Sequence, residues 1–106
     1  MPKYLIRARY TQSGLQGLLA EGGSSRRDAI DQMVAAAGAQ LEVFYFAFGE
    51  DDAYLIVDAP DNVTAAGMSM IVNATGAATT AITVLLTPAE VDEATKVSFD
   101  YRPPGQ

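Results

Sequence analysis

The chain contains no cysteine, no histidine and no tryptophan among its 106 residues. Without cysteine it has neither a disulfide framework nor a thiol nucleophile. Without histidine it lacks the commonest general base and metal ligand, which excludes a Ser-His-Asp triad, a histidine-ligated haem and a typical zinc site. We therefore expect no metal and no cofactor.

Basic residues are also scarce, because seven Lys and Arg stand against 13 Asp and Glu and leave a net charge of −6. A nucleic-acid-binding protein needs a basic surface that displaces counterions, so nucleic acid is not an expected partner. Anionic membranes are unsuitable partners for the same reason. No apolar run approaches the roughly 18 residues of a membrane span and the N-terminus resembles no signal peptide, so we expect a cytoplasmic protein.

Hydrophobic residues make up 49% of the sequence, which is ordinary for a globular domain. The length fits one domain over residues 1–106, with a core from about 4 to 95 and an extended tail over 96–106. A fold of this size buries roughly 60 to 70% of the surface that its unfolded chain exposes, so a partner subunit would help to stabilise it.

Four segments rich in apolar, β-branched and aromatic residues are predicted as strands: residues 4–10, 41–48, 53–58 and 79–87. Apolar residues at helical spacing predict helices from Ser13, from a Ser25–Asp28 capping-box pattern, from Asp61 and from Thr87. The third of these helices contains a regular apolar series: Val63, Ala66, Gly67, Met70, Ile71 and Ala74. The order is β-α-β-β-α-β with the first helical segment split in two, which is the ferredoxin-like pattern of an α+β fold with a four-stranded antiparallel sheet.

Alternation along the predicted strands shows what each sheet face carries. Arg7 shares one face of the first strand with Lys3, Leu5 and Arg9, while Phe44, Phe46 and Phe48 lie opposite Leu41, Val43 and Tyr45 in the second. Three of the four strands are apolar on both faces. Because helices cover only one face of such a sheet, we expect a second copy to cover the other, giving a dimeric α+β barrel.

Three adjacent acids, Glu50, Asp51 and Asp52, follow Gly49 between the second and third strands. Adjacent acids point in different directions and lack the alternating spacing of a calcium loop, so a solvated hairpin turn is the favoured interpretation. In that turn Asp52 accepts hydrogen bonds from backbone amides. A ligand-facing role for Asp52 is the alternative.

Arg7 and Arg9 lie two residues apart and so share a face of a strand. They either pair with Glu42 or Asp58, within the sheet or across the dimer, or form an anion or carboxylate clamp inside the barrel. Tyr45 and Tyr54 either pack as ordinary tyrosines or donate hydrogen bonds into the same cavity. A further pair, Arg26 and Arg27, follows Gly22 and Gly23 at a helix start, where a solvated surface is favoured over an anion site.

Several short stretches together resemble the GYD-domain family over about Tyr4 to Glu90. They are Tyr4-Leu5-Ile6, Tyr10-Thr11, Gly14-Leu15, the hairpin from Tyr45 to Asp52, Asp58-Ala59-Pro60-Asp61, Gly76 with Thr79-Thr80, and Leu86 to Glu90. The resemblance implies an α+β-barrel fold and homo-oligomers, and it implies no agreed reaction. Gly49 and Asp52 match the hairpin motif of the family, but Asp51 stands where the family has a tyrosine. Ala77 and Ala78 occupy a stretch where the family has a basic residue.

Three functions stay open from the sequence. The first is a homo-oligomeric domain that binds a small anionic or aromatic metabolite, with Arg7, Arg9, Tyr45, Asp52, Tyr54 and Asp58 as ligand-binding candidates. The second is a cofactor-independent enzyme of the monooxygenase or isomerase type, with Asp52 and Asp58 as the only strand-end acids and no assigned catalytic residue. The third is a purely structural assembly protein whose barrel is filled by Phe44, Phe46 and Phe48.

Overall fold

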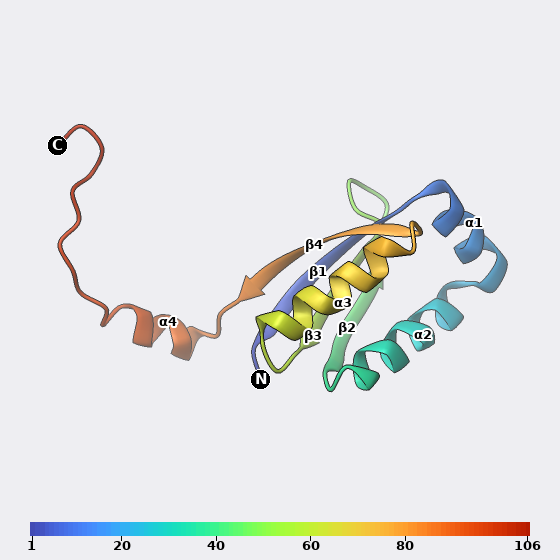
Figure 1. Ribbon diagram of the computed structural model, residues 1–106, viewed down its shortest axis with the longest axis horizontal. Helices are drawn as coiled ribbons and strands as arrows, with labels where there is room; N and C mark the ends of the chain where they lie inside the picture. The colour runs from blue at the N-terminus through green and yellow to red at the C-terminus, as the bar shows by residue number, and fades with distance from the viewer.

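The computed structural model, which describes all 106 residues, has four strands and four helices (Figure 1). They are β1 (Lys3–Tyr10), α1 (Gln12–Glu21), α2 (Gly23–Ala36), β2 (Gln40–Phe46), β3 (Ala53–Asp58), α3 (Asn62–Ala74), β4 (Ala78–Leu85) and α4 (Pro88–Ala94). The strands form one antiparallel sheet in the order β2-β3-β1-β4. The predicted α+β class and ferredoxin-like strand arrangement are thereby confirmed.

Helix starts follow the predicted signals in the second half of the chain and depart from them in the first. Asp61 caps α3 and Thr87 caps α4, each accepting a backbone N–H of the first turn. The prediction of Ser13 for α1 is wrong, because Thr11 is the residue that caps it. The predicted capping box at Ser25 and Asp28 is also wrong. Only Gly22 separates α1 from α2, and its φ of 85° breaks the helix there. Because α2 already begins at Gly23, Ser25 lies inside the helix and does not cap it.

The core lies between one face of the sheet and the helices α2 and α3. β1 contributes Tyr4 and Ala8 to it, and β3 contributes Ala53, Leu55 and Val57. A register shift in β2 between Leu41 and Val43 turns Leu41 toward this core, although strict alternation placed it on the other face. Six of the eleven buried residues are alanine, so the core has little side-chain volume.

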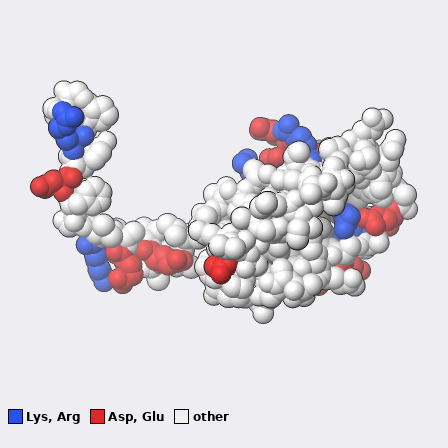
Figure 2. All heavy atoms as spheres, viewed as in Figure 1, with Lys and Arg blue, Asp and Glu red and all other residues white.

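The apolar series predicted in α3 forms the outer surface of that helix. Val63, Met70 and Ile71 are largely exposed, whereas Ala65 and Met68 are the buried residues of α3. Because α3 carries no charged residue and is apolar almost all round, its sequence periodicity does not identify the inner face. The space-filling view shows the resulting uncharged surface, drawn white around α3 (Figure 2).

Residues 86–106 leave the sheet as an extended arm that includes α4, and every one of them is exposed (Figure 1). The arm gives the chain a radius of gyration of 16.9 Å, against about 13 Å for a compact domain of this size. Its apolar side chains Val97, Phe99 and Tyr101 alternate with polar ones and contact no core. No helix of the chain, in the arm or in the body, has the length and apolar character that crossing a membrane requires.

Candidate functional site

The sheet face that points away from α2 and α3, called the open face here, is not covered by any element of the chain. A row of directly paired residues crosses it, running Tyr45–Tyr54–Arg7–Ala81 over all four strands. A second row is mostly apolar and runs Val43–Ile56–Leu5–Thr83. Residues directly opposite in antiparallel strands have neighbouring side chains, so Arg7 lies beside the ring of Tyr54. The mostly apolar second row, with Leu5, adjoins it on the same face.

Arg7 is incompletely paired on this face. One terminal guanidinium nitrogen, Nη1, lies 3.7 Å from a carboxylate oxygen of Asp51. Its Nε is buried and has no hydrogen-bond partner. A buried N–H without an acceptor is costly, so the chain's own groups leave the Arg7 guanidinium incompletely satisfied.

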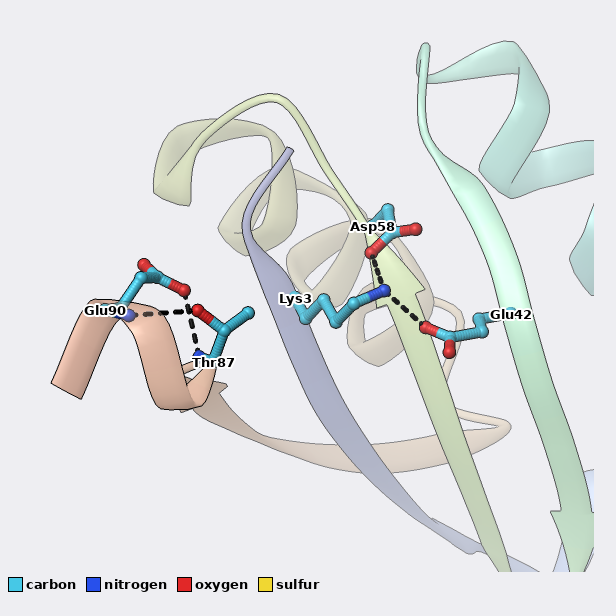
Figure 3. Close-up of polar contacts among 5 residues, drawn as sticks. All are labelled: Lys3, Glu42, Asp58, Thr87 and Glu90. Atoms are coloured by element: carbon cyan, nitrogen blue, oxygen red, sulfur yellow. Dashed lines mark hydrogen bonds and ion pairs between the residues drawn. The ribbon is translucent and has the colours of Figure 1, made fainter. Parts of the chain in front are cut away.

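Lys3 pairs with Glu42 and Asp58, the two acids that were expected to pair with Arg7 or Arg9. Its Nζ donates to Glu42 over 2.7 Å and to Asp58 over 2.8 Å (Figure 3). The hydrogen bond to Asp58, followed by the one to Glu42, raises the pKa of Lys3. The expected pairing of Arg7 or Arg9 with Glu42 or Asp58 within the sheet is therefore wrong, because in the sheet register Lys3 is the residue that stands opposite Asp58. Lys3 was not among the candidates predicted from the sequence, although this residue shares the open face with both arginines.

The acidic hairpin is tied to β1 through all three of its acids. The carboxylate of Asp52 accepts the backbone N–H of Tyr10 over 2.9 Å, and its own N–H donates to the carbonyl of Ala8 over 2.8 Å. Asp51 is the acid that faces Arg7. Arg9 donates from Nε to the Glu50 carbonyl over 2.8 Å. These bonds give the hairpin a structural role, and no group of three or more acidic side chains is arranged to hold a metal ion.

A partly open cavity lies on the opposite side of the sheet, between α2, α3 and the core strands. It has a volume of about 210 Å³ and is lined by 18 residues, 14 of them hydrophobic. Phe44 lines this cavity and Phe46 packs near Gly23 of α2, so both face the helices. Phe48 follows β2 and is fully exposed. A barrel filled by all three rings is therefore wrong, because Phe44 and Phe46 face the helices and not the open face.

The ligand-binding candidates from the sequence thus fall into two groups. Arg7, Tyr45 and Tyr54 share the row across the open face, and Arg9 and Asp58 lie on the same face farther along β1 and β3. Asp52 lies apart from this row, bonded to the Tyr10 amide at the end of β1. The cavity beneath the helices was not predicted, since its lining comes from six different elements and contains no motif.

The family model for the GYD domain matches residues 4–95. The chain belongs to the GYD-domain family. No curated protein and no solved structure matches it. The GYD-domain match covers the sheet and all four helices, so the open face and the cavity both lie within the family's domain.

Proposed function

We propose that this GYD-domain protein is a homo-oligomeric binding domain for a small aromatic anion, with the open face as both the subunit interface and the ligand site. The row Tyr45–Tyr54–Arg7 on an uncovered sheet face is the observation that carries the proposal. Two such faces packed together form an α+β barrel, and its interior brings two copies of this row into one space.

The apolar character of the open face supports the proposed assembly. Leu5, Val43 and Ile56 form an apolar band there, and the chain itself provides no element that covers it. Each chain also has a small core, because over half of its buried residues are alanine. Apolar area removed from water stabilises by roughly 25 cal/mol per Å². An interface over this band therefore adds buried apolar area that the small core does not provide.

The chemistry of the row supports the ligand class. The unpartnered Nε of Arg7 is part of a planar guanidinium that binds a carboxylate through two parallel hydrogen bonds. Tyr54 is the direct neighbour of Arg7, and Tyr45 is the direct neighbour of Tyr54. Aromatic rings pack well against a flat ligand, and their hydroxyl groups bind its polar edge.

Binding is proposed rather than catalysis because the two acids available as a base already have partners. Asp58 is paired with Lys3, and Asp52 accepts the Tyr10 amide. A general base needs to reach the proton that it removes from the substrate. Neither carboxylate lies in the row of Tyr45, Tyr54 and Arg7.

Sedimentation velocity at micromolar concentration tests the assembly. We expect the natural sequence to sediment as a dimer or a multiple of it. Thr83→Glu places a charge at an exposed position of the open face and should shift the protein to monomer. Gln32→Glu adds the same charge at an exposed position of α2 and should leave the mass unchanged. A wild-type protein that is monomeric would refute the barrel.

Calorimetric titration with 4-hydroxybenzoate tests the ligand site. Arg7→Gln should weaken binding by about tenfold or more, the effect of losing about 1.4 kcal/mol. Arg102→Gln changes an exposed arginine of the arm and should bind as the wild type does. The neutral analogue 4-hydroxybenzamide should bind more weakly than the anion. Equal affinity of the Arg7 and Arg102 variants would remove Arg7 from the site.

A further inference from the structure

The cavity beneath the helices exists because small residues face it. Ala8, Ala53 and Ala78 form part of its floor, where larger side chains would fill the space under α2 and α3. Its walls are apolar and include Met33 and Val34 of α2 together with Met68 and Val72 of α3. A dry engineered cavity of about 150 Å³ takes up benzene, so a volume of about 210 Å³ holds a small organic molecule.

Polar groups line this cavity among the apolar ones. Arg26, Tyr10 and Thr75 belong to its lining, as do the hydroxyl groups of Ser69 and Thr80, which bond to each other. Tyr10 and Arg26 are close enough to interact: burial raises the pKa of the Tyr10 phenol, and the positive charge of Arg26 opposes that rise. A neutral phenol donor and a guanidinium thus lie near each other at the wall.

Arg26 is poorly satisfied in the structure. Its Nε is buried without a hydrogen-bond partner, and the nearest acid is Glu21, with a carboxylate oxygen 3.5 Å from that nitrogen. An N–H···O hydrogen bond normally measures 2.7 to 3.2 Å, so this ion pair is a weak one and leaves the guanidinium charge poorly balanced. A carboxylate entering the cavity would balance that charge through the guanidinium group.

We propose that the cavity is a second binding site, which takes a short aliphatic monocarboxylate with its carboxylate on Arg26 and its hydrocarbon chain among the apolar side chains of α2, α3 and the sheet. Arg26 and Tyr10 donate to the carboxylate, and Met33, Met68 and Val72 surround the chain. The site lies on the opposite side of the sheet from Arg7, so it is independent of the proposed open-face site. The cavity is smaller than the roughly 300 Å³ at which drug-sized pockets begin, which restricts the ligand to a short chain.

The charges of Arg26 and Glu21 determine whether a substitution should weaken or strengthen the binding of a carboxylate. Arg26→Gln removes the guanidinium and should weaken binding by about tenfold or more, equivalent to about 1.4 kcal/mol. Glu21→Gln removes the acid that competes for Arg26 and repels an anion, so it should strengthen binding. Arg27→Gln is the matched control, because Arg27 is the next residue along α2, is exposed and does not line the cavity.

The experiment is a titration of the full-length protein, labelled at its methionine and valine methyl groups, with hexanoate and with the neutral analogue hexan-1-ol. Hexanoate should shift the methyl signals of Met33, Met68 and Val72 and show contacts to them in nuclear Overhauser spectra. Hexan-1-ol should bind more weakly. Arg7→Gln should leave these shifts unchanged, which separates this site from the open-face site.

Three results would overturn the second site. The first is the absence of hexanoate contacts at Met33, Met68 and Val72 in the wild-type protein, a result that does not depend on the folding of any variant. The second is equal hexanoate affinity in the Arg26 and Arg27 variants. Binding that disappears with Arg7→Gln but survives Arg26→Gln would assign the carboxylate to the open face alone.

Discussion

The backbone N–H of Tyr10, the last residue of β1, donates to the carboxylate of Asp52, the residue before β3, over 2.9 Å. Asp52 also donates its own N–H to Ala8, so one residue bonds to two positions of β1. The side chain therefore continues the pairing of β1 with β3 beyond the last paired residues, Ala8 and Ala53. This relationship explains why an acid follows the turn at that position.

Loss of the Asp52 carboxylate should destabilise the fold. A hydrogen bond to a charged group contributes about 1.5 to 3 kcal/mol, so Asp52→Ala should lower the free energy of unfolding by about that amount. Asp52→Asn keeps an oxygen acceptor and should cost less. Glu50→Ala is the control, because the structure uses only the carbonyl of Glu50 and its side chain is exposed. Urea unfolding measures all three, and an Asp52→Ala protein as stable as Glu50→Ala would contradict the assignment.

Gly14 and Gly17 lie in the same helix and predict opposite results on substitution. A Cβ at Gly14 would overlap the backbone carbonyl of Ala77, whereas a Cβ at Gly17 meets nothing within 4 Å. Gly17→Ala should stabilise by about 0.5 to 1 kcal/mol, because alanine favours the helix. Gly14→Ala should instead destabilise, since α1 must move away from the loop before β4. Thermal unfolding of the two variants in parallel gives the signs, and similar shifts for both would mean that α1 is not held against Ala77.

Asp61 makes the stability of α3 depend on pH. The backbone N–H of Thr64 holds the pKa of Asp61 below its ordinary value of 3.8. A lowered folded-state pKa means that the stabilisation is fully present above the unfolded pKa and is lost as pH falls through the folded one. Asp61→Asn still caps a helix but does not titrate, so between pH 5 and pH 2 its stability should fall less than that of the wild type. If the free energy of unfolding fell equally with pH in the two proteins, Asp61 would not be the source of the pH dependence.

The two capped helices α3 and α4 should respond differently to loss of their caps. Asp61→Ala removes the cap of a helix that packs on the core, so the urea midpoint should fall. Thr87→Ala removes half of the capping box with Glu90, drawn in Figure 3, but α4 lies in the exposed arm. Its seven residues are too few to be stable without packing, so only local helix content should change. Amide hydrogen exchange at residues 89–95 reads the local effect, and a lower urea midpoint for Thr87→Ala would show that the arm docks.

The strands were predictable from sequence because they are rich in apolar, β-branched and aromatic residues and because glycine or acidic turns bound them. Val57 and Tyr4, for example, fall on the inner face as alternation requires. The inner face of α3 was not predictable, since a helix without charges offers no polar side to mark its surface. The register shift beside Leu41 was also hidden, because a bulge depends on how two strands meet rather than on either strand alone.

The site was predictable only in part, for a similar reason. Arg7 was found because it shares a face of one strand with Arg9, which is a local property, whereas its alignment with Tyr45 and Tyr54 depends on the register between strands. The pairing of Lys3 with Asp58 depends on the register between β1 and β3, which the sequence does not state. Arg26 was visible beside Arg27 at a helix start, but only the packing of α2 over the sheet separates a cavity arginine from a surface one.

The alanine-rich core also determines how sharply a single chain unfolds. The dependence of unfolding on urea grows with the surface that becomes exposed, and alanine side chains expose little of it. The width of a thermal transition follows the enthalpy of unfolding, which grows with the packed surface, so an isolated chain with a small core should melt gradually over a wide temperature range. Subunits that cover the open face add surface to the transition and make it steeper. The melting curve should therefore broaden as the protein is diluted and the copies separate. The extent of the broadening reports how much surface of each chain the other copies cover.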